Sequence, residues 1–223
     1  MEPDDPPHPD PPDAFAPAWP LDAGGGVRDA LLAAYGDPTR GYHDRQHLTE
    51  VIDRVDELAG AGAPGDLLAV HLAAWFHDAV YDGERDAEER SAAWAEEALP
   101  PLVDDAVVAE VARLVRLTED HRPADDDSSG ALLSDADLGI LAAPRARYDS
   151  YVAAVRAEYA HLDDDTFAAG RAHVLRDLLD KPRLFHTAYA VERWERDARA
   201  NAGAELERLE RLERSEQAPA VGG

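Results

Sequence analysis

Apolar residues recur at helical spacing along most of this chain. Between residues 43 and 60 they lie three and four apart, at Leu48, Val51, Ile52, Val55 and Leu58. Comparable spacing predicts further helices over residues 27–35, 66–81, 86–99, 104–121, 131–141, 144–162, 167–179 and 187–214. No segment reads convincingly as a strand, and no internal repeat is found. The pattern therefore predicts an all-α fold, in which residues 24–212 form one multi-helix bundle.

The helix expected over residues 66–81 is apolar on nearly every side, which is typical of a helix in the middle of a fold. Its last turns nevertheless carry the adjacent pair His77 and Asp78. Burying an ionisable pair among apolar residues is unfavourable unless something binds or pairs it. Ordinary hydrogen bonds are one solution, and a divalent metal ion is the more economical one.

Two other helices contribute ionisable residues at positions that should be partly buried. His47 lies beside the apolar stripe of residues 43–60, and Asp137 lies within the apolar segment 131–141. Together with His77 and Asp78, they offer two nitrogens and two oxygens to one ion. Such a set suits Mn, Fe, Co, Ni or Zn, and Mg less well because of the imidazoles. His43 precedes His47 by four residues, so we expect the two to share one helix face.

The composition restricts the partners of this domain. The chain has 223 residues, of which 47 are acidic and 22 basic, giving a formal charge of −25. A field of that sign repels nucleic-acid polymers and anionic membrane surfaces. The absence of cysteine excludes disulfides, thiolate zinc sites and a cysteine nucleophile. The oligomeric state is left open.

The two ends of the chain look unlike the body. Residues 1–23 are rich in Pro and Asp and are expected to form a disordered leader in which His8 has no function. Residues 213–223 are expected to be a frayed tail. The N-terminus lacks the basic and apolar pattern of a signal peptide, so we expect a cytoplasmic protein.

An ordered series of motifs spans most of the chain, roughly from Tyr42 to Asn201. It begins with Tyr42-His43-x-x-x-His47, Trp75-Phe76-His77-Asp78-x-Val80-Tyr81, Glu88-Glu89-Arg90-Ser91-Ala92, Thr118-x-x-His121 and Asp135-Ala136-Asp137-Leu138. It continues with Tyr148-x-x-Tyr151, Arg156-x-Glu158-Tyr159 and Gly170-Arg171. The series resembles the HD-domain superfamily of metal-dependent phosphohydrolases, and more narrowly its branch of predicted metal-dependent HD phosphohydrolases. The chain departs from that branch at Ala87, where the branch carries asparagine.

The resemblance implies a divalent ion held by His47, His77, Asp78 and Asp137. A bound ion lowers the pKa of its water and holds a phosphoryl oxygen. The resemblance implies three further roles. Glu88 or Glu89 would orient or deprotonate the water, and His43 and His121 would contact phosphate or recruit a second ion. Arg156 and Arg171 would contact phosphate oxygens. Each has a plain structural alternative, such as a solvated helix turn for the glutamates and pairing with acids for the arginines.

The expected activity is hydrolysis of a phosphate ester or anhydride of a small molecule, with a nucleotide as the favoured substrate. One alternative is a di-metal oxygenase on the same scaffold, in which His43 and His121 serve a second iron. Another is a metal-stabilised binding or regulatory domain without turnover. Two aspartates of the segment 131–141 are candidate ligands, and Asp137 is chosen because it directly precedes the apolar Leu138, as in the HD pattern. Asp135 is expected to cap a helix or to support the ligands.

Overall fold

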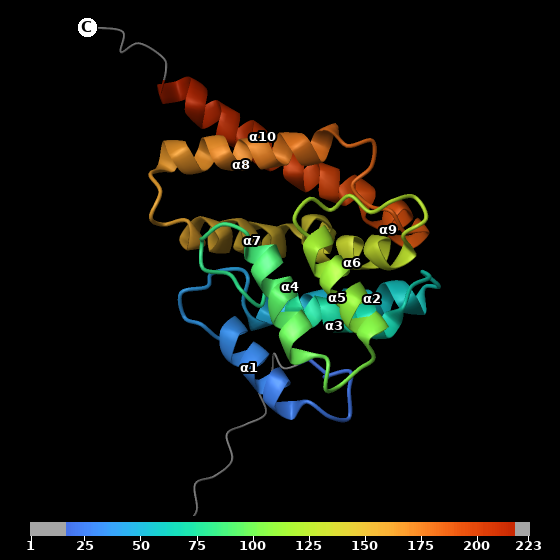
Figure 1. The fold of residues 1–223 in the computed structure, drawn as a ribbon. Coiled ribbons are helices and arrows are strands. Elements are labelled where there is room, and N and C mark those ends of the chain that lie inside the picture. Colours follow the sequence, from blue (N-terminus) through green and yellow to red (C-terminus); the bar gives the residue numbers. More distant parts are fainter. Residues whose placement is uncertain (1–16, 217–223) are drawn as a thin grey trace, which may run out of the picture.

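The protein is built from α-helices, as its periodicity predicts (Figure 1). The computed structural model describes residues 17–216, with side chains through Arg211, and this range contains no strand. Its elements are α1 (Gly25–Tyr35), α2 (Arg45–Gly60), α3 (Leu67–Phe76), α4 (Ala87–Ala98), α5 (Asp105–Leu117), α6 (Ser128–Leu138), the 3₁₀ helix η1 (Gly139–Ala142), α7 (Arg145–Glu158), α8 (Asp164–Asp180), α9 (Ala188–Arg193) and α10 (Glu195–Glu216).

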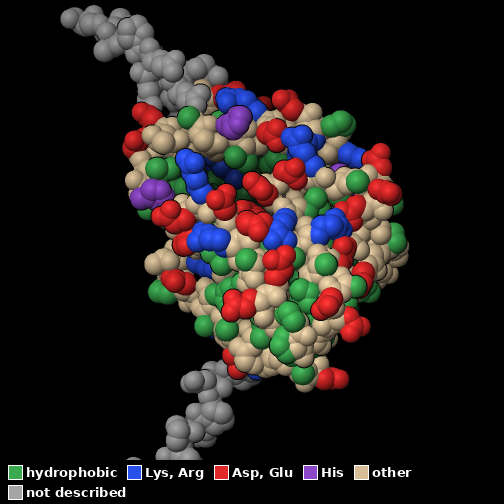
Figure 2. Space-filling view, in the orientation of Figure 1, with side chains coloured by type: hydrophobic (Ala, Val, Ile, Leu, Met, Phe, Trp, Pro, Cys, Tyr) green, Lys and Arg blue, Asp and Glu red, His purple; other side chains and the backbone are tan. Residues whose placement is uncertain are grey.

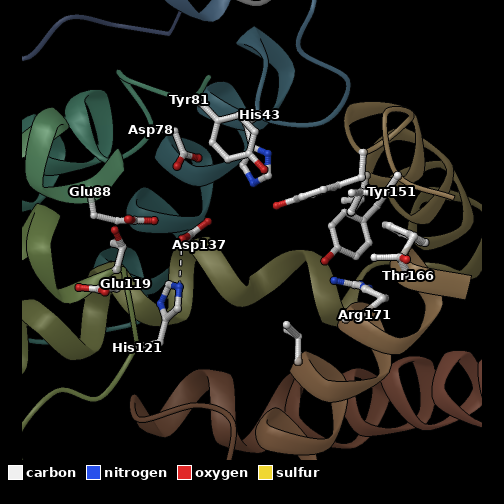
Figure 3. A pocket seen from close by; sticks show the side chains of 17 residues that line it. His43, Asp78, Tyr81, Glu88, Glu119, His121, Asp137, Tyr151, Thr166 and Arg171 are labelled. Carbon is white, nitrogen blue, oxygen red and sulfur yellow. Dashed lines mark ion pairs between the residues drawn. The ribbon is translucent and has the colours of Figure 1, made fainter. Parts of the chain in front are cut away.

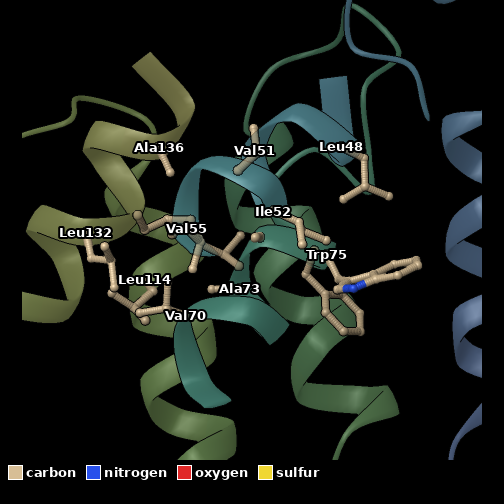
Figure 4. Close-up of a cluster of buried hydrophobic side chains, with 14 of the residues drawn as sticks. Leu48, Val51, Ile52, Val55, Val70, Ala73, Trp75, Leu114, Leu132 and Ala136 are labelled. Carbon is tan, nitrogen blue, oxygen red and sulfur yellow. The ribbon is translucent and has the colours of Figure 1, made fainter. Parts of the chain in front are cut away.

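Helix α3 lies at the centre of the main bundle, packed against α2, α4, α5 and α6 (Figure 4). It is buried on almost all sides because its sequence, LLAVHLAAWF, is apolar at every position except His71. The prediction of a central helix is confirmed, but the helix is shorter than expected. It ends at Phe76, so that His77 is its C-cap and Asp78 lies in the following turn.

Aspartate side chains set where several helices begin. Asp44 accepts hydrogen bonds from the backbone N–H groups of Gln46 and His47 and thereby starts α2. His43 therefore precedes the helix, and the expectation that it shares a helix face with His47 is wrong. Asp163 caps α8 by accepting a hydrogen bond from the Thr166 N–H.

The ends of the described range differ from the expectation. Trp19 makes an edge contact with the buried Trp75, their ring centroids 5.2 Å apart, so residues 17–23 pack on the domain rather than belonging to a disordered leader. The expected helix over residues 187–214 is split at Trp194, and α10 continues to Glu216. Residues 1–16, including His8, and residues 217–223 lie outside the described range. Within residues 17–216, no helix is long and apolar enough to cross a membrane.

Helices α8 and α10 form a second layer above the main bundle (Figure 1). They share a small apolar cluster made of Ala168, Ala172, Leu175, Ala202 and Leu209. The first half of α10 also packs on η1, which ties the layer to the bundle. The neighbouring face of α8, with Phe167, Arg171 and Val174, forms a wall of a cavity.

Within α3, two leucines provide a matched test of the core. Leu72 is fully buried, whereas Leu67 is 43% exposed. We expect Leu72→Ala to lower the free energy of unfolding by about 2–5 kcal/mol, because it leaves a cavity beneath the site. Leu67→Ala should change it by no more than about 0.5 kcal/mol. Urea unfolding followed by circular dichroism measures both, and equal losses would contradict the central position of α3.

Candidate metal centre and pocket

Three side chains from α2 and the end of α3 converge on one point inside the bundle. The Nε2 atoms of His47 and His77 lie 3.0 Å apart, and Oδ2 of Asp78 lies 3.1 Å from each of them. Both histidines are 1% exposed. Nitrogen and oxygen donors grouped this closely could hold a metal ion.

Asp137 approaches the same group from the last turn of α6. Its Oδ1 atom lies 3.4 Å from Nε2 of His47 and 3.7 Å from Nε2 of His77. The structure thus brings together all four residues for which the sequence predicted ligation, from α2, the end of α3 and α6. Whether each one binds an ion stays a prediction.

Hydrogen bonds to the backbone orient the two residues that follow α3. Nδ1 of His77 lies 2.8 Å from the carbonyl oxygen of Ala74, and donation to that oxygen leaves Nε2 unprotonated toward the cluster when the ring is neutral. The N–H of Asp78 donates to the buried Tyr35 hydroxyl at 3.2 Å. A metal ligand needs this kind of fixed tautomer and orientation.

Arg40 holds together the backbone segments around the cluster, a role that the sequence analysis did not predict. Its guanidinium donates to the carbonyl oxygens of His43, Asp78 and Ala79 at 2.9, 2.7 and 3.0 Å. It also lies 5.0 Å from the centroid of the Tyr35 ring. One side chain therefore ties the segment before α2 to the turn after α3. Its position in the Arg40-Gly41-Tyr42-His43 sequence gave no signal beyond its nearness to the histidines.

The electrostatics of the cluster fit a bound cation. Burial lowers the pKa of His77, but Asp78 and Asp137 outweigh it and raise that pKa to about 9. Burial lowers the pKa of His47 below its ordinary value. Burial raises the pKa of Asp78, yet the nearby His77 and His43 hold it well below its usual range. Two facing Nε2 atoms 3.0 Å apart need either a ring proton that one donates to the other or a metal ion that both bind.

His43 is held by Glu158, which belongs to one of the sequence motifs but had no role assigned to it. Oε1 of Glu158 accepts the backbone N–H groups of Gly41, Tyr42 and His43 at 3.0, 2.8 and 2.9 Å, and its Oε2 lies 2.9 Å from Nδ1 of His43. The imidazole stacks on Tyr81 with the centroids 3.9 Å apart. Glu158, at the end of α7, thus fixes both the turn before α2 and the orientation of the His43 ring.

His121 follows α5 in a left-handed backbone conformation, with φ 51°. Its Nε2 atom lies 3.5 Å from Oδ2 of Asp137, so Asp137 faces His47 with one oxygen and His121 with the other. The single lysine of the chain, Lys181, donates to the carbonyl oxygen of Asp120 at 3.0 Å and supports this turn.

A pocket of about 560 Å³ opens above the cluster. In Figure 2 it is a hollow beneath the C-terminal layer, surrounded by acidic and basic side chains. Figure 3 shows Glu88, Glu119 and His121 on one side, Tyr151, Thr166 and Arg171 on the other, and Asp78 and Asp137 between them. The predicted site residues that line it are His43, Asp78, Glu88, His121, Asp137 and Arg171.

Three residues predicted to act in the site, Glu89, Arg156 and Arg171, bond to other groups of the protein. Glu89 binds Arg116 on the surface at 2.6 Å, so of the two candidate glutamates only Glu88 faces the pocket. Arg156 bonds to the turn between α7 and α8. Arg171 lines the pocket but donates to both carboxylate oxygens of the buried Glu205, at 2.8 and 3.1 Å.

Asp135, the alternative to Asp137, anchors another part of the fold. It is fully buried and accepts the backbone N–H groups of His186 and Thr187 at 2.7–3.0 Å. Burial raises its pKa to about 6 despite these bonds. It therefore ties the start of α9 to α6, while Asp137 alone of the two faces the cluster.

Comparisons with known proteins add little to this geometry. No protein-family model and no curated protein matches the chain. Among solved structures, the crystal structure of Bacillus subtilis YpgQ in complex with ADP aligns with 20% identity and a TM-score of 0.45, over 87% of this chain and 99% of that one. A likeness this distant supports no conclusion about function, which must come from the site itself.

Removing a cluster residue tests metal binding directly. We expect His77→Ala or Asp78→Ala to abolish retention of Mn²⁺ or Co²⁺ after dialysis, because each removes a donor from the compact group. Added metal should raise the melting temperature of the wild type but not of these variants, since only a folded site binds it. His71→Ala, on the same helix but paired with Asp56, is the control and should behave as wild type. Full metal content in both cluster variants would remove these residues from the site.

Substitution of one aspartate of α6 should affect metal binding, and substitution of the other should affect folding stability. We expect Asp137→Asn to weaken metal affinity by about 10–100-fold with little change in stability of the metal-free protein. Asp135→Ala leaves two buried N–H groups unpaired and should cost about 1–3 kcal/mol for each, while the folded fraction still binds metal. Metal titration and urea unfolding of both variants measure these effects. Loss of metal affinity in Asp135→Ala together with loss of stability in Asp137→Asn would exchange the roles assigned to the two residues.

Proposed function

We propose that this protein is a metal-dependent phosphohydrolase that cleaves a phosphate ester or anhydride of a small molecule. The observation that carries the proposal is the convergence of His47, His77 and Asp78, with Asp137 beside them, at one end of a pocket large enough for a small molecule. The ordered motifs that resemble the HD superfamily support the same reaction class.

In this proposal, His47, His77, Asp78 and Asp137 hold a divalent ion. Such an ion supplies a lowered pKa for its water and a positive charge beside a phosphoryl oxygen. Mn, Fe, Co, Ni and Zn suit the mixed imidazole and carboxylate donors better than Mg does. The Ala74 carbonyl oxygen orients His77 and Arg40 holds the backbone of Asp78, so these two donors need little rearrangement on binding.

Other lining residues have distinct tasks. Glu88, at the start of α4, is the candidate to accept a proton from the attacking water, since it faces the pocket while Glu89 does not. Near the cluster, burial lowers the pKa of His43, but Asp78 and Glu158 outweigh it and raise that pKa, which favours a protonated ring able to donate to a phosphate oxygen. Arg171 gives the opposite wall a fixed guanidinium oriented by Glu205.

The role of Glu88 is testable against its neighbour. We expect Glu88→Gln to lower kcat by about 10²–10⁴-fold on a substrate drawn from a panel of phosphomonoesters and nucleotides, with metal content unchanged. Glu89→Gln removes only a partner of Arg116 and is the matched comparison. Kinetics with Mn-loaded protein measure both. A larger loss in Glu89→Gln would reverse the assignment, and a wild-type protein that binds metal but cleaves nothing in the panel would favour a binding or regulatory domain.

One observation favours a second metal-dependent candidate. Asp137 faces His47 with Oδ1 and His121 with Oδ2, an arrangement that suits two neighbouring cations. Two irons per chain, together with an oxygen-dependent product, would support the di-metal oxygenase instead. Elemental analysis of the wild type and of His121→Ala distinguishes one ion from two.

A further inference from the structure

The side of the pocket away from Glu88 carries five apolar residues beside Thr166 and Arg171. It is formed by α7, α8 and their connecting turn, through Val155, Tyr159, Leu162, Phe167 and Val174. We call these five residues the apolar wall. Among the described residues, the large hydrophobic side chains that remain exposed are Leu67, Leu68, Tyr159 and Val174. Two of them belong to the wall, so apolar surface is concentrated in the pocket.

The apolar wall is held in place without a ligand. Arg156 donates to the carbonyl oxygens of Tyr159 and Leu162 at 2.8 and 3.1 Å and to Asp164 at 2.6 Å. Its guanidinium also lies 4.8 Å from the centroid of the Phe167 ring. A surface fixed in this way loses little conformational freedom when it is covered, which favours binding.

The charged end of the pocket has little capacity for additional anionic groups. Its carboxylates come from Asp78, Asp137, Glu88 and Glu119, and only part of their charge would be offset by a divalent ion. The basic lining residues each face an acid: Arg171 faces Glu205, His43 faces Glu158, and His121 faces Asp137, which it shares with the cluster. Every phosphate group beyond the first would add repulsion from these carboxylates, since Arg171, already paired with Glu205, is the one arginine or lysine among the described residues that line this pocket. Lys181 lines an adjoining cavity, and its ammonium group bonds to the carbonyl oxygen of Asp120.

From these features we infer that the substrate is a phosphate monoester of a neutral, largely apolar alcohol, rather than a nucleoside polyphosphate. Its phosphate lies at the His/Asp cluster and its carbon body covers the apolar wall. The inference rests on the proposed phosphohydrolase function and narrows its substrate class. It departs from the nucleotide favoured by the sequence, since a polyphosphate chain multiplies negative charge beside the four carboxylates.

A series of alkyl phosphates tests the inference with the leaving-group chemistry held nearly constant. Each methylene buried on the wall should contribute about three- to fourfold in binding. We therefore expect kcat/KM of the Mn-loaded protein to rise at least about tenfold from ethyl to hexyl phosphate. Calorimetric titration with ethylphosphonate and hexylphosphonate, which are not hydrolysed, should show the same order of affinity.

Two exposed apolar residues form a matched pair of variants. Val174 in the wall is 48% exposed, and Leu67 at the start of α3, outside the pocket lining, is 43% exposed. Val174→Ser should reduce the hexyl-to-ethyl ratio in both kinetics and phosphonate binding. Leu67→Ser should leave both ratios at their wild-type values. Because both positions are exposed, neither variant is expected to prevent folding.

The outcomes separate the inference from the proposed function. Equal kcat/KM for ethyl and hexyl phosphate, a ratio unaffected by Val174→Ser, or faster cleavage of a nucleoside triphosphate than of hexyl phosphate would overturn the inference while leaving hydrolysis established. Chain-length-dependent phosphonate binding without turnover of any phosphate would support the apolar wall and overturn the hydrolase function.

Discussion

The structure depends on the burial of an ionisable cluster at the end of its most apolar helix. His47 and His77 are almost inaccessible, and their facing nitrogens lie 3.0 Å apart beside two carboxylates. In a bundle built around α3, water cannot offset these charges fully, so the cluster needs a positive charge between its acids. A divalent ion meets that need with the donor types present, and the other features of the pocket follow from the position of the cluster.

Two residues to which the sequence analysis assigned no role, Arg40 and Glu158, hold the backbone around the cluster in place. The turn after α3 and the segment before α2 are irregular, and irregular backbone needs side-chain partners to hold one conformation. Arg40 bonds to carbonyl oxygens of both segments, while Glu158 accepts three consecutive N–H groups of the second. These two charged side chains connect α7 and both segments, so the geometry of the site depends on the whole bundle.

The C-terminal layer, α8 and α10, provides one side of the pocket. The main bundle supplies the histidines and acids, whereas α8 supplies Phe167, Arg171 and Val174 from its free face. Glu205 on α10 fixes Arg171 against that wall. The pocket consequently has one side of histidines and acids and another on which apolar residues surround the paired Arg171, an arrangement suited to a molecule that joins an anionic group to a carbon body.

The sequence by itself determined the all-α fold, the central helix and the set His47, His77, Asp78 and Asp137, because helical periodicity and motif order are encoded locally. The predicted start of α2 and the predicted end of α3 were wrong, although Asp44 is a typical N-cap residue and indicated where α2 begins. Only the tertiary structure decided that Glu88 faces the pocket and Glu89 does not, and that Arg156 and Arg171 already have partners. Arg171 and Glu205 lie 34 residues apart, and such pairings depend on where packing brings distant helices together rather than on local pattern.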